Sequence, residues 1–218
     1  MRPLRARIDL GALCANLAAV RRAVPRARIL AVIKANAYGH GLAAVGRALG
    51  EADGLAVACL EEALVLREAG VRAPILLLEG FFEDDEMTLA ARHRLACVVH
   101  DHHQVAMLER RAAPPALDLW IKTDTGMNRL GFPPAEIPSV LERLVARGGF
   151  ARQRTVLMTH FAEADRPDSE ATLEQIRRFE ALEVPSGVLR SAANSAALLA
   201  RPESHYDWVR PGLLLFGA

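Results

Sequence analysis

The sequence predicts an α/β fold of the (β/α)8 TIM-barrel type, formed as one domain over residues 1–218. Eight short apolar runs alternate with amphipathic segments, a pattern typical of βα units around a parallel sheet. About half of the residues (51%) are hydrophobic, so a chain of this length can bury a large core. Polar residues gather at the ends of the runs, where the active sites of such barrels lie.

We expect each apolar run to contain one strand. The runs are Ile29–Asn36, Gly54–Leu60, Pro74–Gly80, Ala96–Asp101, Leu117–Asp124, Thr155–Phe161, Val188–Asn194 and Trp208–Gly217. No run leads into a G-x-G-x-x-G or P-loop pattern, which disfavours an open nucleotide-binding sheet.

The segments between the runs carry helix signals. Asp9 is a candidate N-cap for a first helix that Pro25 ends, with apolar residues at helical spacing (Leu13, Leu17, Val20 and Val24). Residues 61–70 open with two glutamates and close with a glycine, and residues 81–86 resemble an acidic helix start. After the eighth run no eighth helix follows, so we expect an exposed apolar flank over residues 213–216.

Composition excludes several classes of protein. The formal net charge is +1 without a basic face, so we expect no nucleic-acid partner. No apolar stretch reaches the ~20 residues that a membrane span needs, and Asp9 and Asn16 interrupt the N-terminal apolar segment that would otherwise resemble a signal peptide. Three distant cysteines indicate free thiols and a cytoplasmic protein. The histidines of residues 100–103 lack further ligands at metal-site spacing, so we expect no metal.

The most informative segment is residues 31–41, A-V-I-K-A-N-A-Y-G-H-G. Lys34 follows an apolar strand, where desolvation favours the neutral amine that attacks an aldehyde. A lysine at a strand end can equally extend its charge into water. Taken alone, Arg129 would be a surface ion-pair former and His160 a core histidine.

Several segments together resemble the alanine racemase family. Residues 31–41 are similar to its lysine motif, and K-T-D-T-G-M-N-R-L-G over residues 122–131 is similar to its K-x-D-T-G-M-x-R-x-G loop. Further similar segments follow the family's order, namely residues 8–17, Thr159–Ala162, Asn194–Ser195 and Arg210–Gly217.

The resemblance implies a pyridoxal 5'-phosphate enzyme that interconverts L-alanine and D-alanine with two bases. Lys34 would carry the cofactor and act as one base, Arg210 would face the ring nitrogen, and His160 would orient Arg210. Arg129 would contact the phenolic oxygen and the substrate carboxylate, and Lys122 matches a lysine that is carbamylated in several members. The cofactor phosphate would be bound by hydroxyl and backbone groups, for which the candidates are Tyr38, Asn194, Ser195, Gly212 and Leu213.

Family members continue into a β-rich second domain that supplies the other base, a tyrosine, across a dimer interface. The resemblance therefore implies that this chain is the barrel domain without the C-terminal β-domain. We expect a homodimer for the full-length protein and poor racemase activity for the barrel alone.

Two alternatives stay open at this point. One is a single-domain pyridoxal-phosphate carrier barrel without turnover, whose lysine motif normally lacks the A-N-A-Y-G-H-G continuation. The other is a racemase or decarboxylase of the same barrel type that acts on a larger amino acid.

Overall fold

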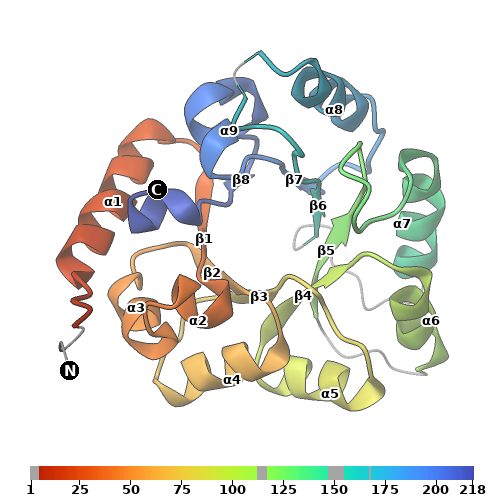
Figure 1. Ribbon diagram of the computed structural model, residues 1–218. Helices are drawn as coiled ribbons and strands as arrows, with labels where there is room; N and C mark the ends of the chain where they lie inside the picture. The colour runs from red at the N-terminus through yellow and green to blue at the C-terminus, as the bar shows by residue number, and fades with distance from the viewer. Residues whose placement is uncertain (1–4, 112–116, 147–154, 167) are drawn as a thin grey trace.

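The computed structural model describes residues 5–111, 117–146, 155–166 and 168–218, and it forms a closed barrel of parallel strands in the order β1 to β8. Figure 1 looks along the barrel, with the strands at the centre and the helices in a ring around them. The predicted (β/α)8 barrel is confirmed.

Each predicted run matches one strand, and every strand is shorter than its run, although β1 and β4 begin one residue before theirs. The bounds are β1 Arg28–Val32, β2 Gly54–Val57, β3 Ile75–Leu77, β4 Leu95–Val99, β5 Asp118–Lys122, β6 Val156–Met158, β7 Leu189–Ser191 and β8 Trp208–Val209. Because the strands stop early, the polar ends of the runs form loops at the carboxyl end of the barrel.

The helices follow the expected signals. Their bounds are α1 Leu10–Ala23, α2 Lys34–Tyr38, α3 Leu42–Ala48, α4 Leu60–Glu68, α5 Asp84–Arg92, α6 His102–Arg110, α7 Ile137–Ala146, α8 Glu170–Glu180 and α9 Ser195–Ala200, with 3-10 turns η1 Pro134–Glu136, η3 Pro202–Ser204 and η4 Leu213–Phe216. Asp9 caps α1 by accepting the N–H of Ala12 at 3.1 Å, and Glu83 opens α5 in a capping box with Glu86.

The core has two parts because strand side chains alternate between faces. Leu30 and Val32 of β1 point into the barrel, where they pack with inward residues of the other strands such as Trp120. Ile29 and Ala31 point the other way and pack in the larger layer between the strands and the helices.

The eighth run differs from its prediction. Only residues 208–209 pair as a strand, since Pro211 has no N–H to donate to a ladder, and residues 213–216 form η4 instead. In Figure 1, η4 lies beside α1, and Asn16 of α1 donates to the carbonyl oxygen of Leu215 at 3.0 Å. The expected exposed flank is wrong for Leu215, which is fully buried, while Leu213 is 52% exposed.

Candidate active site

One cavity of about 800 Å³ opens at the carboxyl end of the barrel. All the residues that the sequence singled out line it: Lys34, Tyr38, Lys122, Arg129, His160, Asn194, Ser195, Arg210, Gly212 and Leu213. Lys122 is the last residue of β5, and the others come from the segments that follow β1, β5, β6, β7 and β8. The barrel therefore brings together groups that lie up to 179 residues apart in the chain (Lys34 to Leu213).

Lys34 stands at the start of an unusual turn. The element labelled α2 is not a regular helix, because Ala35, Asn36, Ala37 and Tyr38 all have φ between 52° and 55°. A left-handed conformation costs about 1–2 kcal/mol for each non-glycine residue. Strain of this kind persists only where the surroundings hold it, and it is concentrated at functional sites.

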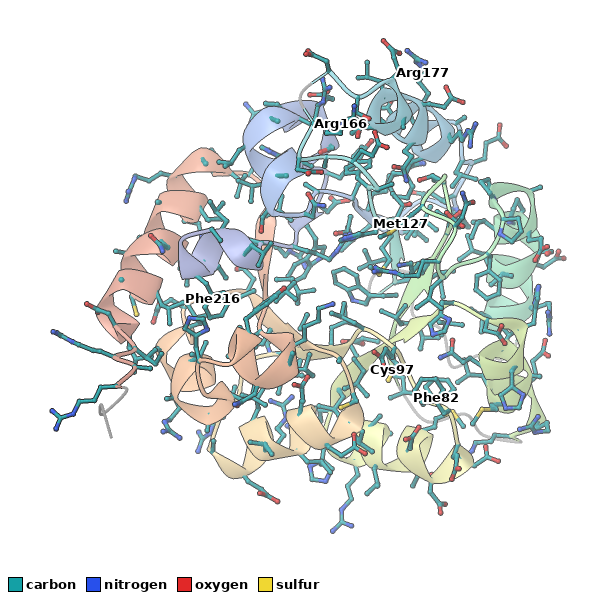
Figure 2. The ribbon with its side chains drawn as sticks, viewed as in Figure 1. Phe82, Cys97, Met127, Arg166, Arg177 and Phe216 are labelled. Atoms are coloured by element: carbon teal, nitrogen blue, oxygen red, sulfur yellow. The ribbon has the colours of Figure 1, made fainter. Side chains whose placement is uncertain are left out.

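Tyr38, Gly212 and Ser195 meet on one wall of the cavity. A Cβ atom on Gly212 would lie 2.5 Å from the Tyr38 hydroxyl oxygen, so only glycine permits this approach. The Ser195 hydroxyl oxygen accepts the N–H groups of Gly212 (2.9 Å) and Leu214 (3.2 Å). Because both lone pairs are used, the Ser195 hydroxyl proton is available to an acceptor in the cavity. Figure 2 labels Phe216 of η4, whose ring packs against Tyr38 and His40.

Asn194 is placed by its capping role. Its side-chain oxygen accepts the N–H of Ala197 at 3.0 Å, which makes it the N-cap of α9. The cap fixes the backbone immediately before Ser195.

Arg210 is buried in the cavity floor. Its guanidinium donates to the hydroxyl of Ser191 and to the carbonyl oxygens of Thr159 and Ala192, and it lies 3.4 Å from Nδ1 of His160. Burial lowers the pKa of Arg210 to about 10. The group therefore remains a cation at neutral pH and donates hydrogen bonds without accepting any.

His160 is held as a neutral ring. Burial, with the positive charge of Arg210 next, lowers the pKa of His160 to about 3. Because Nδ1 faces the Arg210 donor, it serves as the acceptor and the ring proton belongs on Nε2.

Lys122 is a buried lysine among cations. It is 7% exposed, and burial together with the charges of Arg210 and Arg129 lowers its pKa to about 8. An appreciable fraction of this amine is thus neutral at a pH where an ordinary lysine is charged.

Arg129 is exposed at the cavity mouth on a loop with a defined conformation. The Asp124 carboxylate accepts three successive backbone N–H groups, those of residues 126–128, at 2.9–3.1 Å. A Cβ on Gly131 would lie 2.9 Å from the backbone nitrogen of Asp124, so glycine closes the loop. Figure 2 labels Met127 on this loop.

The sequence reasoning missed Gln175 of α8. Its carbonyl oxygen accepts the N–H of Ala162 at 2.9 Å, and its amide nitrogen donates to the carbonyl oxygen of His160 (3.0 Å) and the hydroxyl of Thr125 (3.3 Å). It joins the loop that carries Arg129 to the loop that carries His160. One signal was available, since Gln175 occupies a polar position on the buried face of α8 with Thr172, Ile176 and Phe179.

Three further features bear on the earlier expectations. Cys14, Cys59 and Cys97 are all free thiols. Among the described residues, no group of three or more histidine, cysteine or acidic side chains is arranged to hold a metal ion. Within the same residues, no helix is both long and apolar enough to cross a bilayer.

Comparison with known proteins gives one consistent family. The model of the alanine racemase N-terminal domain matches residues 8–218. An alanine racemase of Nitrosospira multiformis is 50% identical over 218 residues, which are 100% of this chain and 60% of that protein. The chain therefore spans about three fifths of the length of such relatives.

Solved structures agree with the sequence match. The crystal structure of the biosynthetic alanine racemase of Pseudomonas aeruginosa has a TM-score of 0.90 and 43% identity, over 100% of this chain and 61% of that one. A Bartonella henselae alanine racemase with covalently bound pyridoxal phosphate has a TM-score of 0.84 and 26% identity, over 96% of this chain and 62% of that one. On the family match and these likenesses, the chain belongs to the alanine racemase N-terminal domain family.

Proposed function

We propose that this chain is the cofactor-binding barrel of an alanine racemase, which interconverts L-alanine and D-alanine with pyridoxal 5'-phosphate. The observation that carries the proposal is that one cavity is lined by all ten of these residues: Lys34, Tyr38, Lys122, Arg129, His160, Asn194, Ser195, Arg210, Gly212 and Leu213. Family membership supports the same reaction.

The donor set fits pyridoxal phosphate. A phosphate dianion accepts hydrogen bonds, and the available Ser195 proton and the Tyr38 hydroxyl are donors on one wall. Because Gly212 has no Cβ, the Tyr38 hydroxyl can lie close to the Gly212 backbone. Asn194 and the Leu213 backbone complete this wall. When bound, the cofactor supplies an electron sink that acidifies the α-proton of an amino acid.

Each cationic residue then has a distinct task. The Lys34 amine would anchor the cofactor and move the α-proton on one face of the substrate. Arg210, held by Thr159 and Ala192 and backed by neutral His160, would donate to the ring nitrogen and could not take a proton from it. Arg129 binds the substrate carboxylate at the mouth, where its loop is fixed by Asp124.

Lys122 is proposed to carry a carbamate. The ammonium group first loses a proton to solvent. The neutral nitrogen then attacks the carbon of carbon dioxide, a C–N bond forms as one C=O π bond breaks, and a second proton leaves to solvent, so that a cation becomes an anion. That anion would lie among the positive charges that now lower the pKa of Lys122, which include those of Arg210 and Arg129. The carbamate would then hold Arg129 in place.

The second base is proposed to come from outside this chain. We infer a homodimer in which a β-domain of one subunit brings a tyrosine to the barrel mouth of the other. Two apolar side chains that line the cavity are exposed, Leu199 (64%) and Leu213 (52%). Their exposure supports the proposal that a second subunit covers the barrel mouth. A barrel without this base should lose about 10²-fold to 10⁴-fold of the racemisation rate.

The three free thiols support a reducing compartment, which we take to be the cytoplasm. The carrier alternative is not favoured, because the family model and the relatives are alanine racemases. Alanine is preferred over a larger amino acid for the same reason.

Covalent trapping tests the proposal. The protein is incubated with pyridoxal phosphate, reduced with borohydride and digested, and the labelled peptide is identified by mass spectrometry. We expect the label on Lys34, and Lys34→Ala should abolish it, while Lys122→Met should keep it. A label on Lys122 alone, or none on the wild type, would overturn the assignment.

A further inference from the structure

The backbone that follows Lys34 needs an external support. Residues 35–38 form a left-handed turn without a glycine, and the N–H of Ala37 donates back to the carbonyl oxygen of Ile33, which precedes the turn, at 2.9 Å. Non-glycine residues in this region are individually disfavoured, so the sequence of the turn does not select its conformation. Some contact outside the turn must select it.

That contact is Glu62 of α4. One carboxylate oxygen accepts the N–H of Asn36 at 2.9 Å, and the other accepts the N–H of Ala58 at 2.9 Å. Ala58 lies directly after β2 and lines the cavity. A single side chain thereby fastens the turn after β1 to the loop after β2.

The chemistry of a carboxylate suits this position. Two N–H donors converge on it, and an ionised carboxylate is an acceptor through both oxygens, which makes both bonds charge-assisted. An amide would offer one acceptor and one donor, so it could hold only one of the two N–H groups. The Asn36 side chain also supports the turn, because its oxygen accepts the N–H of Leu42 at 2.8 Å.

We propose that Glu62 is a positioning residue for Lys34: it holds the left-handed turn of residues 35–38 and thereby directs the amine into the cavity. The inference rests on the proposed function, because it concerns the lysine that would carry the cofactor. Glu62 itself does not line the cavity and touches no reacting atom in this scheme.

The test measures the pyridoxal phosphate concentration that half-saturates borohydride-fixed labelling of Lys34. Glu62→Ala should raise this concentration at least about tenfold, equivalent to about 1.4 kcal/mol. Glu62→Gln should raise it less, because one acceptor remains. Glu68→Gln, an exposed glutamate on the same helix, is the matched control and should stay within about twofold of the wild type.

A rescue separates positioning from general stability. Ala35 is exposed and has φ 54°, so Ala35→Gly removes the penalty of a left-handed alanine without opening a hole. In the Glu62→Ala background it should recover most of the lost labelling, although it cannot repair a loss of α4 stability. Thermal unfolding, read alongside, shows whether Glu62→Ala has folded; if it has not, the rescue is run on Glu62→Gln.

Two results would overturn the role of Glu62 while leaving the proposed function intact. They are equal half-saturation in the wild type and Glu62→Ala, and a labelling defect that Ala35→Gly does not reduce at all. Failure of the wild type to be labelled on Lys34 would remove the proposed function, and the role of Glu62 with it.

Discussion

Lys122 offers the sharpest perturbation, because its environment sets both its charge and its reactivity. Burial and the charges of Arg210 and Arg129 lower its pKa from 10.5 to about 8. At pH 8 about half of the amine is neutral, against about 0.3% for an ordinary lysine, so the reactive form is enriched by about two orders of magnitude. Bicarbonate-derived carbon dioxide should therefore convert Lys122 to a carbamate.

The same shift predicts a stability effect. A lysine whose pKa is lower in the folded state binds its proton less tightly there, so folding is penalised at neutral pH and regains stability between pH 8 and pH 10.5. The full shift corresponds to about 3 kcal/mol, an upper value for a group that is still slightly exposed. Lys122→Met keeps the volume and removes the charge, so it should stabilise the protein at pH 7 in the absence of carbon dioxide.

Two measurements check this reasoning. Carbon-13 NMR with labelled bicarbonate at pH 8 should show a carbamate signal that Lys122→Met abolishes. Thermal unfolding at pH 8 should show that bicarbonate stabilises the wild type and leaves Lys122→Met unchanged. A carbamate signal of equal size in Lys122→Met would show that the carbamate forms on another amine, and a wild type without a signal would refute the reactivity expected of Lys122.

Three other perturbations have definite expected outcomes. Gly212→Ala places a Cβ 2.5 Å from the Tyr38 hydroxyl oxygen and should weaken pyridoxal phosphate binding about tenfold in a titration. Unchanged affinity would contradict the assignment of Tyr38 to the phosphate site. Gln175→Leu leaves the Ala162 N–H and the His160 carbonyl without their partner and should cost about 2–4 kcal/mol in denaturant unfolding. The control Thr172→Val, on the same buried face, removes a hydroxyl that has no hydrogen-bond partner among the described residues and should cost less than about 0.5 kcal/mol. Folding lowers the pKa of His160 from 6.5 to about 3, so the protein should lose stability as the pH decreases from 6.5 to 3. His160→Asn should flatten the dependence of the melting temperature on pH over this range. An equal slope in both proteins would contradict a neutral, buried His160.

The barrel was predictable because its signals are local and repeated. Each strand coincides with an apolar run to within one residue at its start, and Asp9 and Glu83 cap helices where the sequence indicated helix starts. The chemical groups were predictable because they stand at run ends, as Lys34 and His160 do. Local pattern could not show the left-handed turn of residues 35–38, because alanine and tyrosine rarely adopt a positive φ and the stabilising carboxylate lies 26 residues from Asn36.

The same reasoning explains why the eighth run was misread. The apolar residues of the run favour a strand, but Pro211 has no backbone N–H to donate to a neighbouring strand. The carbonyl oxygen of Pro211 still accepts the N–H of Val32 at 2.8 Å, which is a hydrogen bond to β1. Beyond it, Leu215 is buried in η4 with α1 alongside, a long-range packing that no window of sequence contains.

The charges of the cavity favour anionic ligands. Four cationic residues line it, Lys34, Lys122, Arg129 and Arg210, against two acids, Glu79 and Asp165. The nearby Asp124 carboxylate is occupied by three backbone N–H groups of its own loop. Burial lowers the pKa of Lys122 and of His160 most, and the unmatched positive charge lowers both further, so these cations repel one another. A cofactor phosphate, a substrate carboxylate and a carbamate on Lys122 would each relieve part of that repulsion, and their binding should therefore be mutually reinforcing.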